Sequence, residues 1–261
     1  VNYWRDTVAR NIELVEILSS QTPVSFGGKT VLDIGCGTGG LARMVTEQGG
    51  SYIGLDFYPA ILEMAQALLS DLPDSASAQL LRGSGTSLPL RDESVDLVTA
   101  FDVIEHLVVG EPWQQAFLRE IRRVLRRDGI LLLTTPNRLY PFEPHTNLYG
   151  PHYLPVSLAD RYIRWRNPSF LQEYLTYGEI HLLTPWKMKG LLENSGLRLI
   201  PDFPGGLPIA SYARAKRLGL RLLCAAGLGW FAPSCFWISA CRAEDWDTVR
   251  TRRHRKSGHE G

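Results

Sequence analysis

A run of glycines directly after a short apolar segment is the feature that most restricts the fold of this chain. Residues 30–34 (Thr-Val-Leu-Asp-Ile) have the composition of a buried strand, and Gly35, Gly37, Gly39 and Gly40 follow at once. Glycine lets the backbone turn tightly and lets a ligand approach with no Cβ in the way. The segment therefore predicts a strand, a ligand-binding turn and a helix, which together form one unit of a parallel α/β sheet.

Short apolar segments then alternate with longer helical ones along the chain. Helices are expected at residues 39–47, 59–69, 111–127 and 185–194, and further strands at residues 52–55, 79–81, 95–101, 130–135, 197–200 and 235–240. This alternation is typical of a parallel sheet with helices on both faces. We therefore expect an α/β fold with a doubly wound, seven-stranded, mostly parallel, Rossmann-like sheet.

Two irregular stretches interrupt this pattern without any obvious domain linker. Residues 1–249 are therefore interpreted as a single domain that begins with an amphipathic helix over residues 4–20. We expect the first insertion, residues 136–183, to form a lid over the substrate, and the second, residues 201–233, to form an amphipathic or apolar cap. Residues 250–261 hold five basic residues and one acidic residue, and we expect this tail to be disordered.

Charge and cysteine usage exclude several classes of partner. The 261 residues include 28 basic and 27 acidic side chains, so the net charge is +1 and no global field favours nucleic acid. Four cysteines (Cys36, Cys224, Cys235 and Cys241) lack C-x-x-C spacing and are not paired with histidine as in metal sites. We therefore expect free thiols in the cytoplasm, no metal and no nucleic-acid partner.

One uncharged stretch bears on membrane contact. Residues 222–241 are nominally long enough to cross a bilayer, but Gly227, Gly229 and Pro233 favour a helix, a turn and a buried strand instead. Basic residues precede this stretch, which is typical of an amphipathic element at a membrane surface (Arg214, Lys216, Arg217 and Arg221). Peripheral membrane contact therefore remains an alternative to a purely cytoplasmic location.

The glycine spacing leaves the cofactor class open. Gly35, Gly37 and Gly40 satisfy the dinucleotide pattern G-x-G-x-x-G, and Asp56 ends the next strand, where a carboxylate can accept both hydroxyls of an adenosine ribose. Tyr212 and Lys216 also have the spacing of a short-chain dehydrogenase pair. The alternatives are therefore an NAD(P)-dependent oxidoreductase and a non-catalytic module that binds an adenosine ligand or docks on a membrane.

Three further features favour a different adenosine cofactor. Asp33 lies two residues before the first glycine, where it would repel a pyrophosphate and attract a cationic or zwitterionic ligand. Residues 83–90 (Gly-Ser-Gly-Thr-Ser-Leu-Pro-Leu) and 101–106 (Phe-Asp-Val-Ile-Glu-His) precede and follow the fourth strand, and residues 134–137 (Thr-Thr-Pro-Asn) close the fifth. As a set these segments resemble the class I S-adenosylmethionine-dependent methyltransferases.

The resemblance is to the branch that includes ubiquinone-biosynthesis O-methyltransferases, and it covers residues 28–137, 181–200 and 234–242. It implies that the last strand is antiparallel. It also implies S-adenosylmethionine as cofactor, S-adenosylhomocysteine as product, and a set of residues that contact the cofactor. These are Asp33, Gly35, Cys36, Gly37, Thr38 and Gly39 at the methionine part, Asp56 at the ribose, Phe57, Ser84, Gly85 and Thr86 at the adenine, and Phe101 and Asp102 near the methyl group.

Histidines supply the candidate bases for methyl transfer, because the pKa of histidine lies near working pH. His106 follows the fourth strand closely, and an alternative role for it is packing at the helix start beside Glu105. His145 and His152 lie in the segment that follows the fifth strand. These three residues are the predicted catalytic candidates.

The first insertion is predicted to select the acceptor. Nine aromatic residues fall within residues 140–177, where they can pack the lid on itself and line a pocket for an apolar or aromatic molecule. The expected substrate is therefore a small molecule of this kind. We expect O-methylation first, with N- and C-methylation left open.

Overall fold

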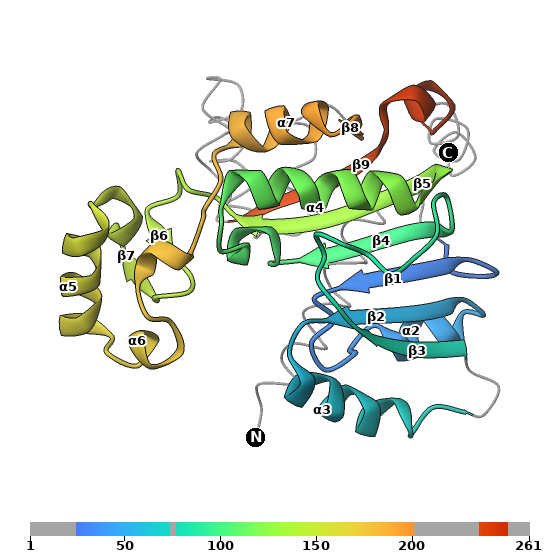
Figure 1. Cartoon of the computed structure of the whole chain (residues 1–261), viewed down its shortest axis with the longest axis horizontal. Coiled ribbons are helices and arrows are strands. Elements are labelled where there is room, and N and C mark those ends of the chain that lie inside the picture. The colour runs from blue at the N-terminus through green and yellow to red at the C-terminus, as the bar shows by residue number, and fades with distance from the viewer. Residues whose placement is uncertain (1–24, 74–76, 201–234, 250–261) are drawn as a thin grey trace, which may run out of the picture.

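The computed structural model describes residues 25–73, 77–200 and 235–249 (Figure 1). The helix expected at residues 4–20, the cap expected at residues 201–233 and the tail at residues 250–261 lie outside these ranges. No helix in the described part of the chain is both long and apolar enough to span a membrane.

A seven-stranded sheet forms the centre of the structure, in the order β3-β2-β1-β4-β5-β9-β8. Its strands are β1 (Thr30–Ile34), β2 (Ser51–Asp56), β3 (Ser77–Arg82), β4 (Val95–Phe101), β5 (Leu125–Pro136), β8 (Leu197–Leu199) and β9 (Cys235–Arg242). β9 runs antiparallel to both of its neighbours, and the pairs from β3 to β5 are parallel. The predicted Rossmann-like sheet with an antiparallel last strand is confirmed.

Helices cover both faces of this sheet because its buried strands present apolar side chains on alternate sides. Val98 and Ala100 of β4 join the core beneath α4 (Glu111–Val124) and α7 (Pro185–Asn194). Leu97, one residue earlier, joins the opposite core with α2 (Ala42–Glu47), against which residues of α3 (Pro59–Leu69) pack. The carboxyl ends of β1, β2 and β4 therefore meet at one edge, where α/β sheets bind ligands.

The helix predicted over residues 111–127 is three residues too long. α4 ends at Val124, and β5 begins at Leu125, which pairs with Val95 of β4. Leu125 is fully buried, and Nη1 of Arg126 lies 2.7 Å from Oδ2 of Asp96 in β4. Burial and strand pairing therefore override the helical propensity of the Leu-Arg-Arg sequence.

The first insertion forms a small lobe with its own core. It contains a hairpin of β6 (Phe142–Glu143) and β7 (Leu148–Tyr149), followed by α5 (Val156–Arg166) and α6 (Phe170–Glu173). Its core consists of Leu148, Ala159, Ile163, Phe170, Tyr177, Ile180 and Leu182. Figure 1 shows the lobe beyond the end of the sheet where β5 leads into it.

Candidate functional site

The glycine loop joins β1 to α2 in a conformation that needs glycine. Gly35, Gly37 and Gly39 have φ values of +68°, +54° and +75°, which L side chains rarely adopt. The N–H of Gly35 donates to the carbonyl of Leu55 at 2.8 Å, so the loop folds onto the end of β2. A Cβ on Gly35 would lie 2.5 Å from Cγ2 of Val103, whereas one on Gly37 would meet no atom within 4 Å. The loop is therefore packed behind Gly35 and open beside Gly37.

Asp56 holds the open part of this loop. Its Oδ2 accepts the N–H of Gly37 at 3.1 Å, and its Oδ1 accepts the N–H of Tyr58 at 3.0 Å. Each carboxylate oxygen keeps further lone-pair capacity, so both can still accept a ligand hydroxyl. Phe57, the next residue, is 61% exposed and meets the Tyr58 ring edge to face, which leaves exposed ring surface that can cover a planar ligand.

Polar groups around the loop are also available to a ligand. Thr38 Oγ1 is buried but has no hydrogen-bond partner among the described residues. Such an orphaned hydroxyl is costly unless a ligand or water satisfies it. The Ser84 and Thr86 hydroxyls lie 2.8 Å apart at the end of β3. Burial raises the pKa of the Cys36 thiol, so Cys36 stays neutral and contributes packing.

Asp33 is buried at the end of β1 and is fully engaged by the protein. Its Oδ1 accepts the hydroxyl of Thr99 at 2.7 Å, and its Oδ2 accepts the hydroxyl of Tyr52 at 2.9 Å. Burial raises its pKa to about 6, although both hydrogen bonds act in the opposite direction. Asp33 therefore places a negative charge behind the loop at neutral pH, and its oxygens are not simply open to a ligand.

Asp102 follows Phe101, the last residue of β4, in a strained conformation. Its φ is +54°, in the left-handed region that is uncommon for non-glycine residues. Two hydrogen bonds to Thr134 hold it there, one from its own N–H to the carbonyl at 3.0 Å and one from Oγ1 of Thr134 to Oδ1 of Asp102 at 2.9 Å. Strain that is retained in this way is common at functional sites.

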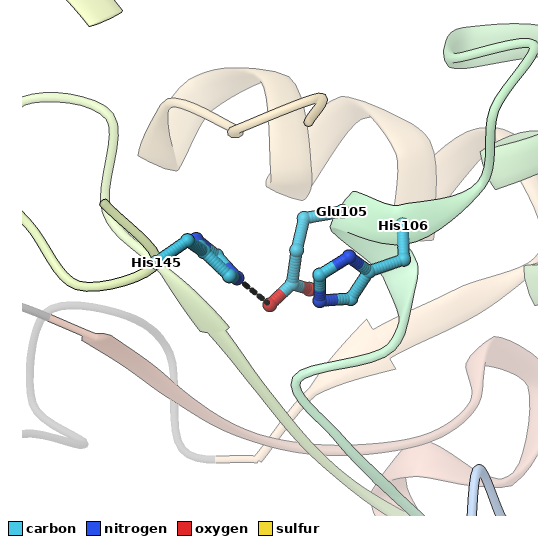
Figure 2. A group of neighbouring side chains, drawn as sticks. All are labelled: Glu105, His106 and His145. Atoms are coloured by element: carbon cyan, nitrogen blue, oxygen red, sulfur yellow. Dashed lines mark ion pairs between the residues drawn. The ribbon is translucent and has the colours of Figure 1, made fainter. Parts of the chain in front are cut away.

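Two of the three predicted catalytic histidines come together next to Asp102. His106 ends the short helical turn η1 (Ile104–His106), and His145 lies between β6 and β7 of the lobe. Their rings meet edge to face, with centroids 4.9 Å apart. Glu105 lies between them, with Oε1 3.8 Å from Nε2 of His145, as Figure 2 shows. We call Glu105, His106 and His145 the polar cluster.

Buried carboxylates orient this cluster. Glu143 Oε1 lies 2.6 Å from Nδ1 of His145, and Thr135 Oγ1 donates to Oε2 of Glu105 at 2.9 Å. Burial raises the pKa of Glu105, and the nearby charge of Asp102 adds to this effect. Burial also lowers the pKa of His106 to about 4, so this ring is neutral at pH 7. Burial acts in the same direction on His145, but its bond to Glu143 outweighs it and raises the pKa.

His152, the third candidate, lies elsewhere in the lobe. Its ring is 98% buried and packs on Tyr153, with centroids 4.1 Å apart. Sequence reasoning named Glu105 only as the neighbour of His106 and missed Glu143 and Thr135. Glu143 could have been found from its spacing of two residues from His145, but Thr135 is brought to Glu105 only by the fold.

Comparison with known families matches residues 32–133 to a methyltransferase domain. The matched residues run from β1 to β5, and these two strands form the parallel part of the sheet with β2, β3 and β4.

Curated relatives carry consistent names. A protein of Mycobacterium sp. (strain KMS), named an uncharacterized methyltransferase, is 37% identical over 61% of this chain and 58% of its own length. A protein of Mycolicibacterium smegmatis, named a probable S-adenosylmethionine-dependent methyltransferase, is 35% identical over 55% of this chain and 49% of its own length. The chain thus spans about half the length of the curated relatives it matches.

A solved structure shows the same fold over more of the chain. The S-adenosylmethionine-dependent methyltransferase of Mesorhizobium loti superimposes with a TM-score of 0.56 and is 18% identical. The match covers 86% of this chain and 95% of that one. At this identity the likeness concerns the fold alone.

Proposed function

We propose that this protein transfers a methyl group from S-adenosylmethionine to a hydroxyl oxygen of an apolar or aromatic small molecule. The observation that carries this proposal is a juxtaposition at one edge of the sheet. The glycine loop held by Asp56 follows β1, and Glu105 and His106 of the polar cluster follow the adjacent strand β4. A nucleoside site and a group of proton-accepting side chains therefore lie side by side.

The cofactor would be held by the residues that surround the loop. S-Adenosylmethionine supplies an electrophilic methyl group on a positively charged sulfur. Asp56 would accept the ribose hydroxyls, with Phe57 and the backbone near Ser84, Gly85 and Thr86 at the adenine. Gly35 to Gly39 would approach the methionine part, with Asp33 providing negative charge behind them. Phe101 and Asp102 would lie nearest the methyl group.

The acceptor would enter beside the polar cluster, where the lobe meets η1. Tyr174 of the lobe stacks near His106, with ring centroids 6.1 Å apart, so an apolar surface adjoins the cluster. A hydroxyl nucleophile must lose its proton, and His106, His145 and Glu105 are the groups that could assist. We assign His152 to packing of the lobe. Two buried free cysteines in the described ranges, Cys36 and Cys241, suit the cytoplasmic location we propose.

The alternative functions have less support. The Tyr212 and Lys216 pair that would favour an oxidoreductase lies outside the described residues, as does the basic element before residue 222 that would favour membrane contact. The buried carboxylate of Asp33 disfavours a pyrophosphate at the glycine loop. A non-catalytic binding module would not need the polar cluster.

The charge on Asp33 gives a pH-dependent prediction for cofactor binding. Its pKa of about 6 means that the free protein is mostly protonated there at pH 5 and ionised at pH 7.5. A cationic ligand favours the ionised form, so the affinity for S-adenosylmethionine should rise across this range, by up to about tenfold per pH unit below the pKa. Calorimetric titration at several pH values measures this. In Asp33→Asn the rise should flatten, and an equal rise in this variant would contradict the assignment.

An acceptor screen tests the proposed reaction. The protein is incubated with S-adenosylmethionine and matched aromatic acceptors that carry a hydroxyl, an amine or a thiol, and release of S-adenosylhomocysteine is measured. We expect release above the acceptor-free rate with the hydroxyl series. Turnover of amines alone would overturn O-methylation. Cofactor binding without turnover of any series would favour the non-catalytic module.

A further inference from the structure

The polar cluster has the composition of a metal site. Two imidazoles and one carboxylate converge from segments that are distant in the sequence, η1 and the turn between β6 and β7. Their candidate ligand atoms all lie within 4.8 Å of one another, and Figure 2 shows the Glu105 carboxylate between the two rings. Two histidines and one carboxylate form a recurring ligand set for divalent transition metals in enzymes.

Neighbouring residues orient two of these groups as they do in metal sites. When His145 is neutral, its 2.6 Å contact with Glu143 favours a proton on Nδ1, and the lone pair of Nε2 then lies on the side of Glu105. A carboxylate behind the distal nitrogen is the usual support for a histidine that binds metal. The bond from Thr135 to Oε2 of Glu105 fixes the carboxylate in the same way.

One oxygen in the cluster is left without a hydrogen bond. Oε1 of Glu105 is buried, has no hydrogen-bond partner within the described ranges, and is directed at the His145 ring. The whole Glu105 side chain is inaccessible to solvent. A buried acceptor without a hydrogen bond costs about 1–3 kcal/mol of stability, and more when the group is charged. A bound cation would satisfy it.

The local charge also favours a dication. Glu143 is fully buried behind His145, and Asp102 is close enough to influence Glu105 electrostatically. Three carboxylates thus lie around the two histidines, and those of Glu105 and Glu143 are fully buried. Buried charges of one sign are costly unless they are paired or coordinate a metal.

The three side chains need to move only a short way to reach the distances found in a zinc site. Ligands about 2.0–2.2 Å from a tetrahedral zinc lie about 3.3–3.6 Å from one another. The distance from Nε2 of His145 to Oε1 of Glu105 is 3.8 Å, and the widest separation in the cluster is below 4.8 Å. Side-chain rotations that move the ligand atoms by about 1 Å would therefore bring them to these distances.

We propose that Glu105, His106 and His145 bind one divalent transition metal of the zinc or iron class. Magnesium is disfavoured because it prefers oxygen ligands and keeps several waters. The cysteine pattern had predicted no metal, and this site uses none of the cysteines. Three protein ligands leave at least one coordination position for another molecule.

The role of this metal rests on the proposed methyl transfer, whereas the site itself does not. The acceptor hydroxyl would occupy the free position, and the metal would lower its pKa so that its proton passes to solvent. The electron pair of the resulting oxyanion would form the O–CH₃ bond. The S–CH₃ bond would break, its pair would remain on sulfur, and S-adenosylhomocysteine would leave.

Cobalt binding tests the site without an acceptor. Untagged full-length protein is stripped with a chelator, dialysed into metal-free buffer and titrated with Co²⁺ alone, a coloured substitute for zinc. We expect one Co²⁺ per chain, with the visible absorption bands of a site that has fewer than six ligands, and displacement by Zn²⁺. Glu105→Gln and His145→Gln should lose these bands. Glu143→Gln should keep the three ligands and weaken binding by about 10–100-fold.

A matched histidine provides the control. His181 contacts the carbonyl of Val108 at 2.9 Å and is outside the cluster, so His181→Gln should bind Co²⁺ as the wild type does. Circular dichroism and titration with S-adenosylhomocysteine show that each variant is folded. No Co²⁺ binding by the folded wild type, or equal binding by the cluster variants, would overturn the metal site. If the metal site fails in this way, binding of S-adenosylhomocysteine by the stripped protein would still support the proposed function. Conversely, a protein that binds Co²⁺ but not S-adenosylhomocysteine would support the metal site and contradict the proposed function.

Discussion

Replacement of Asp56 by alanine is expected to abolish measurable binding of S-adenosylhomocysteine. In the proposed complex the carboxylate accepts two ribose hydroxyls, while in the free protein it already fixes the N–H of Gly37 at 3.1 Å. Hydrogen bonds to a charged group contribute about 1.5–3 kcal/mol each. Loss of two of them corresponds to a decrease in affinity of at least about 100-fold, since 1.4 kcal/mol is tenfold. Isothermal titration measures the change.

Asp92 provides the control for this variant. Its side chain is 74% exposed and pairs with Arg123 on the surface, away from the glycine loop. Asp92→Ala should bind S-adenosylhomocysteine with wild-type affinity. Undiminished binding by a folded Asp56→Ala protein would show that the ribose is held elsewhere.

Gly85 and Phe117 should show the largest coupled effect on stability. A Cβ on Gly85 would lie 2.6 Å from Cε2 of Phe117. Phe117 belongs to α4, and its ring is fully buried in the core on that face of the sheet. Gly85→Ala should therefore lower the free energy of unfolding by about 1–3 kcal/mol through overpacking. Phe117→Ala should lower it by about 3–5 kcal/mol through loss of burial and a new cavity. Chemical denaturation monitored by circular dichroism measures both changes.

The double variant separates this mechanism from general damage. Without the Phe117 ring the added methyl group at position 85 has room, so the double variant should be more stable than the sum of the single effects predicts. Gly190→Ala is the matched control, because a Cβ there meets no atom within 4 Å and the residue is inside α7. This variant should be unchanged or stabilised by up to about 1 kcal/mol. Strict additivity at positions 85 and 117 would contradict the contact.

The sheet could be predicted from local sequence because its signals are local. Three of the five residues of β1 are apolar, as are five of the seven residues of β4. The end of α4 could not be predicted, because it depends on the pairing of Leu125 with Val95 across the sheet. Local propensity contains no information about that partner.

In the candidate site, too, some features follow from local sequence and others depend on the fold. Asp33, Asp56 and the glycines follow strands directly, so their position at one edge of the sheet follows from the topology. The polar cluster depends on the path of the chain through α4 and β5 into the lobe, which returns His145 to η1 39 residues after His106. Sequence reasoning therefore identified His106 and His145 separately, while their contact and the supporting roles of Glu143 and Thr135 required the fold.

Calorimetric titration of the wild-type protein with S-adenosylmethionine, S-adenosylhomocysteine and NADH tests the cofactor assignment directly. The glycine loop, Asp33 and Asp56 should bind the two sulfur ligands at a single site in the micromolar range and should not bind NADH. Binding of NADH alone would contradict the assignment of this loop to S-adenosylmethionine and, with it, the proposed methyl transfer.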